Sequence, residues 1–151
     1  MALKGSISRK RCSEYSALIL AALILLPSPA RSAEPQIVAY YFHTSIRCRT
    51  CLLIEERAED ILRFEFADLF KRGILQWRAV NVQLSENRHF LEDLYVSPKS
   101  LVLVEYRDGA PRKRTILPKV WQFVHDDDPA VFDGYVAEKT RAFMEEDTPS
   151  P

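Results

Sequence analysis

The sequence has no excess of charge of either sign. Its 21 lysine and arginine residues balance its 21 aspartate and glutamate residues, so the formal net charge at pH 7 is +0. A chain of this kind has no net electrostatic field that would draw it to nucleic acid or to anionic lipid. We therefore expect no nucleic-acid partner and no charge-driven binding to a membrane surface.

The sequence also lacks an apolar run long enough to cross a membrane. The run ALILAALILL, residues 17–26, falls well short of the roughly 20 residues that a membrane-spanning helix needs. Basic residues precede it, and the small residues that follow it end at Ala30, where a signal peptidase would cut. These features predict a secretory signal peptide over residues 1–30, and hence an exported protein, periplasmic where the organism has an outer membrane. An uncleaved signal segment is the one part of the chain expected to contact the membrane.

Cysteine is scarce, with three residues in the whole chain. Cys12 lies within the predicted signal peptide, so the mature chain keeps only the pair in Cys48-Arg49-Thr50-Cys51. Outside the reducing cytosol, these two cysteines can form a disulfide only with each other. A bridge between residues so close in sequence closes a very small loop and removes little chain entropy. The spacing therefore favours a redox dithiol or half of a metal site over a structural bridge.

Hydrophobic periodicity in the rest of the chain predicts one domain over residues 36–146, followed by a loose tail at 147–151. We expect strands at residues 36–42, 76–82, 100–107 and 111–117, and helices at 51–71, at 86–94 and in the region 118–146. Gly73 ends the first helix, Ser85 caps the second, and Asp108-Gly109 forms a hairpin turn. Gly134 weakens the prediction of an unbroken last helix.

The order of these elements, β-α-β-α-β-β-α, predicts an α/β fold with a mixed central sheet flanked by helices. The strand-helix-strand unit at its start favours parallel pairing, and the hairpin adds an antiparallel edge. Cys48 and Cys51 then follow a central strand at its carboxyl end. Open α/β sheets place their functional sites at that edge.

The predicted position of Cys48, at the N-terminus of a helix, favours its thiolate form. Unpaired backbone N–H groups and the helix dipole stabilise negative charge there. Arg47 and Arg49 flank Cys48, and either would lower its pKa further by turning toward the sulfur. We predict that Cys48 is the attacking nucleophile and that Cys51, one turn into the helix and more buried, is the resolving thiol. Glu55 and Glu56 are interpreted as part of the solvated helix face. The alternative for Glu55, four residues after Cys51, is that it helps to move the Cys51 proton through water.

A strand-helix-strand frame that carries this CxxC motif resembles the thioredoxin fold, over residues 36 to about 144. The segments FHTSIRCRTCLLIEE, WRAVNV, ENRHF and KSLVLVEYRDG are similar to the thioredoxin-like proteins called the nitrophenyl compound nitroreductase subunit ArsF family. The resemblance implies the fold and a redox role for Cys48 and Cys51. It does not imply reduction of nitro groups, because nothing in the sequence indicates a flavin or nicotinamide site, and we expect no cofactor.

The sequence departs from the thioredoxin-like pattern at the position that usually holds a cis-proline beside the motif. Counting back from Asp108-Gly109 places Lys99 to Leu101 nearest that position, and not Pro98. A serine-proline bond permits a cis form at Pro98, and the alternative, which we favour, is an ordinary loop proline that precedes a strand.

A metal site is the alternative use of the same cysteines. His43 would join Cys48 and Cys51 as a third ligand, with His89 or His125 as a fourth, in a set suited to zinc or copper. Two functions therefore remain open. The first is an exported thiol-disulfide oxidoreductase or electron-passing protein that acts on protein thiols, disulfides or a redox partner. The second is a metal-binding or redox-sensing module without turnover. The sequence leaves the oligomeric state open.

Overall fold

The computed structural model describes residues 35–146. The predicted signal peptide at 1–30 and the predicted tail at 147–151 lie outside the described residues. The strands are β1 (Gln36–His43), β2 (Leu75–Asn81), β3 (Ser100–Arg107) and β4 (Ala110–Ile116). The helices are α2 (Arg49–Glu65), α3 (Ala67–Lys71), α4 (His89–Asp93), α5 (Val120–Phe123) and α6 (Pro129–Glu145), and a 3-10 turn, η2, spans Ser85–Asn87.

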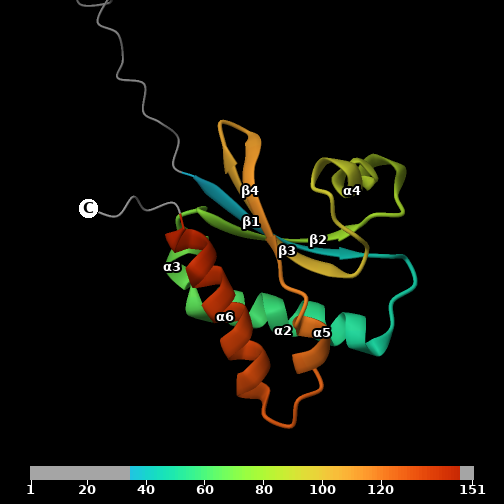
Figure 1. The fold of residues 1–151 in the computed structure, drawn as a ribbon, viewed down its shortest axis with the longest axis vertical. Helices are drawn as coiled ribbons and strands as arrows, with labels where there is room; N and C mark the ends of the chain where they lie inside the picture. Colours follow the sequence, from blue (N-terminus) through green and yellow to red (C-terminus); the bar gives the residue numbers. More distant parts are fainter. Residues whose placement is uncertain (1–34, 147–151) are drawn as a thin grey trace, which may run out of the picture. The chain divides into compact units, whose positions relative to one another are not determined.

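The four strands form one mixed sheet in the order β2-β1-β3-β4 (Figure 1). β1 is parallel to β2 and antiparallel to β3, and β3 is antiparallel to β4. The hairpin turns at Asp108 (φ 53°) and Gly109 (φ 77°), as an Asp-Gly pair does in a tight two-residue turn. The predicted α/β fold with a mixed sheet flanked by helices is confirmed, and β1 is a central strand.

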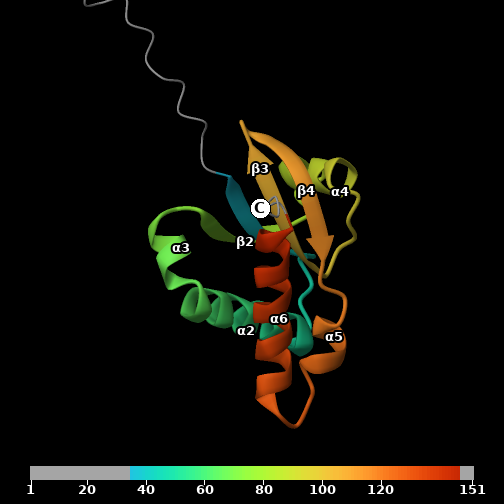
Figure 2. The ribbon, with the colours of Figure 1, turned by 60° about the vertical axis from the view of Figure 1, so that its left-hand side comes forward.

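Helices cover the two faces of the sheet unequally. On one face α6 crosses α2, and α5 lies beside them (Figure 2). On the other face lies the short α4 (Figure 1). Alternation along β1 sends Tyr41 into the core under α2, α5 and α6, while Tyr40 and Phe42 pack toward α4. Because both faces of β1 are buried, the strand is apolar on both sides.

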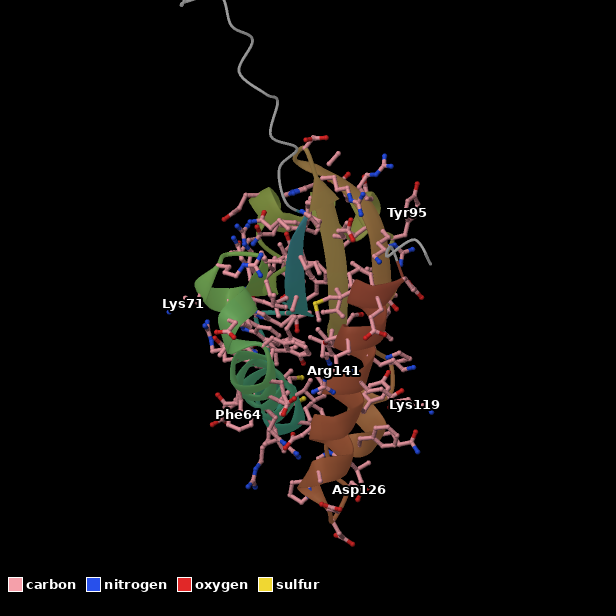
Figure 3. All side chains as sticks on the ribbon, turned by 90° about the vertical axis from the view of Figure 1, so that its left-hand side faces the viewer. Phe64, Lys71, Tyr95, Lys119, Asp126 and Arg141 are labelled. Atoms are coloured by element: carbon pink, nitrogen blue, oxygen red, sulfur yellow. The ribbon has the colours of Figure 1, made fainter. Side chains whose placement is uncertain are left out.

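The predicted helix over 51–71 differs from the structure at both ends. It begins earlier, at Arg49, and it breaks at Phe66, whose backbone (φ −122°, ψ 32°) leaves the helical region before α3 starts. The Phe66 side chain at the break is buried in the core. The outer side of α2 carries Phe64, which is exposed (Figure 3). Gly73 ends α3 with a positive φ of 74°, as predicted.

The second predicted helix, 86–94, is wrong in its extent. The segment divides into η2 and the five-residue α4. Ser85 does not cap a helix, because its hydroxyl donates to the Glu86 carboxylate instead. The last helix, by contrast, runs unbroken through Gly134, with Asp128 as its N-cap accepting from the Ala130 N–H at 2.9 Å. None of the helices within residues 35–146 is both long enough and apolar enough to cross a bilayer.

Candidate functional site

The Cys48-Arg49-Thr50-Cys51 motif forms the start of α2. Cys48 is the N-cap, with an extended backbone (φ −77°, ψ 162°). Its sulfur accepts a hydrogen bond from the Cys51 backbone N–H at 3.3 Å, in place of the oxygen that usually caps a helix. Cys48 is exposed and Cys51 is buried, and both are free thiols. The structure thus presents one sulfur to solvent and holds the other behind it.

The surroundings of Cys48 favour its ionised form. The pKa of the Cys48 thiol is lowered, first by a hydrogen bond from the Cys51 side chain and then by the Cys51 backbone N–H, with a smaller contribution from the positive charge of Lys99. The direction agrees with the sequence prediction, but the expected source of charge was wrong. Arg47 is instead paired with Glu55.

Lys99 is held beside the end of β1 by its backbone. Its N–H donates to the Phe42 carbonyl at 2.6 Å, and its carbonyl accepts from the Trp121 indole N–H at 2.9 Å. Its φ is +66°, a left-handed conformation that is costly for any residue with a side chain. Such strain persists only where neighbouring contacts enforce it, often at a functional site. These contacts fix the residue whose charge acts on Cys48.

Pro98 precedes β3 in a turn, and no peptide bond within residues 35–146 is cis. Its interpretation as an ordinary loop proline is confirmed. Ser100 begins β3 opposite Phe42, and its hydroxyl donates to the Ser97 carbonyl at 2.7 Å.

A polar group lies behind the buried thiol. Tyr41, on β1, is 0% exposed, and its hydroxyl is close to the Cys51 thiol. The Arg47–Glu55 ion pair adjoins the same phenol, and both of its side chains are about four-fifths buried, at 22% and 21% exposed. The interpretation of Glu55 as a solvated surface residue was therefore wrong, whereas Glu56 is exposed.

The three histidines do not join the cysteines in one ligand set. His43 bonds to the neighbouring Thr44 carbonyl, and the His89 ring lies against Phe90, tilted by 32° with the ring centroids 4.3 Å apart. His125 does reach the motif, where its Nε2 lies 3.1 Å from the Thr50 hydroxyl. Within residues 35–146, no three side chains of His, Cys, Asp or Glu come close enough together to hold a metal ion. The alternative set of Cys48, Cys51 and His43 is therefore not assembled.

One surface hollow is separate from this site. It lies on the α4 side of the sheet, where Tyr40 and Tyr106 share a hydrogen bond of 3.1 Å between their hydroxyls. Neither cysteine lines it. The chemistry available at the motif is therefore that of an exposed sulfur and its buried partner.

Lys99 and Tyr41 are the two residues of the site whose roles were not predicted from the sequence. The sequence indicated Lys99 only by its distance from the hairpin, and Tyr41 only as part of the strand predicted at residues 36–42. Comparison with known proteins adds no further guide, because no protein family, curated protein or solved structure matches the chain.

Proposed function

We propose that this protein is an exported thiol-disulfide oxidoreductase or electron-passing protein of thioredoxin-like fold, with Cys48 as nucleophile and Cys51 as resolving thiol. One observation carries the proposal: an exposed Cys48 sulfur caps α2 and accepts the Cys51 N–H, while Cys51 is buried directly behind it. An exposed, low-pKa thiol is the form of cysteine that attacks disulfides.

The proposed reaction has two steps. The Cys48 thiolate attacks a partner disulfide, which forms a mixed disulfide and releases one partner thiolate. The Cys51 thiol then loses its proton and attacks the Cys48 sulfur, which closes the Cys48–Cys51 disulfide and releases the second partner thiolate. Two electrons pass from the protein to the partner, and the reverse sequence oxidises partner thiols.

The thioredoxin-like assignment is supported by the arrangement of the sheet. The β1-α2-β2 unit is parallel, the β3-β4 hairpin is antiparallel, and the motif follows β1 at its carboxyl end. Protein thiols or disulfides, or a dedicated redox partner, are substrates that an exposed Cys48 sulfur can reach.

Trapping of the mixed disulfide tests the proposal. The full chain carrying Cys12→Ser, to remove the third thiol, is reduced and treated with oxidised glutathione. With Cys51→Ser added, we expect one glutathione to remain attached at Cys48, because the resolving thiol is missing. With Cys48→Ser added, we expect little adduct, because Cys51 is buried. Equal attachment of glutathione to the two variants would contradict the assigned roles of Cys48 and Cys51. In the parent chain, glutathione that attaches and is never released would favour a sensor over an oxidoreductase.

A further inference from the structure

Two buried polar atoms behind the motif lack a hydrogen-bond partner. Among residues 35–146, the buried side-chain nitrogen and oxygen atoms without one are the Tyr41 hydroxyl oxygen and Arg47 Nε. Both belong to groups that can donate a proton into a hydrogen bond. Because buried polar groups are almost always satisfied, two orphaned donors in one place need an explanation.

The Cys51 sulfur is an acceptor close to the Tyr41 hydroxyl. Burial is the largest cause of the raised pKa of the Tyr41 phenol, and the Cys51 thiol is the next, ahead of Arg47 and Glu55. The Glu55 carboxylate is already paired with the Arg47 guanidinium. A neutral thiol is a weak acceptor, which explains why the hydroxyl makes no normal hydrogen bond to it. A thiolate in the same place is a strong one.

We propose that the Tyr41 hydroxyl donates a hydrogen bond to the Cys51 sulfur in its thiolate form, and so accelerates closure of the Cys48–Cys51 disulfide. The inference rests on the proposed function and assigns the group that stabilises its second step. In that step the Cys51 thiol gives its proton to a base in the solvent, hydroxide or buffer. The new bond joins Cys51 to Cys48. The bond from Cys48 to the partner sulfur breaks, and its electron pair leaves with the partner thiolate.

The two steps can be followed separately with a coloured reagent. The reduced full chain carrying Cys12→Ser is mixed with an equimolar amount of a nitrobenzoate disulfide. The nitrobenzoate thiolate that this reagent releases absorbs visible light. The first release reports attack by Cys48, and the second reports attack by Cys51 on the mixed disulfide. Both rates are measured across a range of pH, together with the thermal unfolding of each variant.

For Tyr41→Phe we expect the second release to slow by about threefold. Losing one hydrogen bond to a charged group lowers the thiolate fraction of Cys51 by about tenfold, and the greater nucleophilicity of a less acidic thiol offsets about half of that change on a logarithmic scale. The pH profile of the second release should also move to higher pH, because the thiolate is harder to form. The first release should stay within about twofold of the parent, because Tyr41 lies behind Cys51 and not beside the exposed Cys48. Thermal stability should be unchanged or higher, because the substitution removes an unsatisfied buried hydroxyl.

Tyr40→Phe is the matched control. The same atom is removed one residue earlier on β1, where the side chain faces α4 and the hydroxyl bonds to Tyr106 instead of a cysteine. We expect both releases to keep the parent rates. A second release that is equally fast in Tyr41→Phe, or that slows without any change in its pH profile, would overturn the role of Tyr41 while leaving the two-step exchange intact. Absence of a second release in the parent chain would overturn the proposed function itself.

Discussion

Removal of the charge of Lys99 should make Cys48 less acidic. The backbone of Lys99 is fixed by its bonds to Phe42 and Trp121, and its ammonium group is the positive charge that lowers the pKa of the Cys48 thiol. Asparagine is the most suitable replacement, because it is neutral and tolerates the left-handed backbone (φ +66°) that position 99 requires. Lys99→Arg keeps the charge and serves as the conservative partner.

The size of the effect follows from the exposure of both groups. Cys48 and Lys99 are both exposed, and exposed opposite charges interact weakly, so the thiolate fraction below the pKa should fall by about twofold to fivefold. A less acidic thiol is also more nucleophilic once ionised, which offsets about half of that change on a logarithmic scale. The alkylation rate at a fixed mildly acidic pH should therefore fall by only about 1.5-fold to twofold, while the midpoint of the rate-against-pH curve moves up.

The assay is alkylation of Cys48 by a neutral reagent over a pH series, in the full chain carrying Cys12→Ser and Cys51→Ser so that one thiol reacts. The shift should shrink in about 1 M salt, where the screening length falls to about 3 Å. Lys71→Asn is the charge control, because Lys71 is exposed at the end of α3, beyond the far end of the 17-residue α2 (Figure 3). An unchanged midpoint in Lys99→Asn, or an equal shift in Lys71→Asn, would refute the argument.

Three further predictions concern the stability of the fold, each measured by urea denaturation. Asp128→Ala should lower the free energy of unfolding by about 1 kcal/mol, because it removes the side-chain cap of α6, whereas Asp128→Asn should stay close to the parent. Leu103→Ala should lower the free energy of unfolding by about 2–5 kcal/mol, because the Leu103 side chain is 0% exposed in the core beneath α2 and α6. A decrease of less than about 1 kcal/mol would mean that the core is packed differently. The reduced chain should gain stability relative to its Cys48→Ser variant as the pH rises from the lowered pKa of Cys48 toward the ordinary thiol value of 9.0. A thiol whose pKa is lowered in the folded state stabilises the fold at high pH, and this contribution is lost as the pH falls through the lowered pKa. A difference in stability between the two chains that does not vary with pH would contradict the lowered pKa.

The frame of the site was predictable because its signals are local. The apolar run of β-branched and aromatic residues at 36–42 predicts β1. Gly73 marks the turn after α3, and Asp108-Gly109 marks the turn after β3. The break at Phe66 was not predictable from periodicity, because Leu69 and Phe70 continue the apolar stripe beyond it. The segment before β3 was read as one helix for the same reason, since the spacing of Phe90, Leu91 and Leu94 is helical although only α4 forms.

The polar surroundings of the two sulfurs depend on contacts between distant segments. Glu55 and Glu56 are neighbours in sequence, and only the structure distinguishes the residue that pairs with Arg47 from the one that stays in solvent. Tyr41 reads as core in the sequence, and its relation to Cys51 arises from packing of α2 on β1. The charge that acts on Cys48 comes from Lys99, which lies 51 positions away in the chain.

The reduction potential of the Cys48–Cys51 couple tests the account most directly. The full chain carrying Cys12→Ser is equilibrated with glutathione buffers, and its free thiols are trapped and counted. An exposed, stabilised thiolate at Cys48 predicts a potential near or above about −230 mV, in the range of proteins that exchange disulfides. A disulfide that stays closed in every glutathione buffer, with a potential below about −300 mV, would identify a structural bridge and contradict the proposed function.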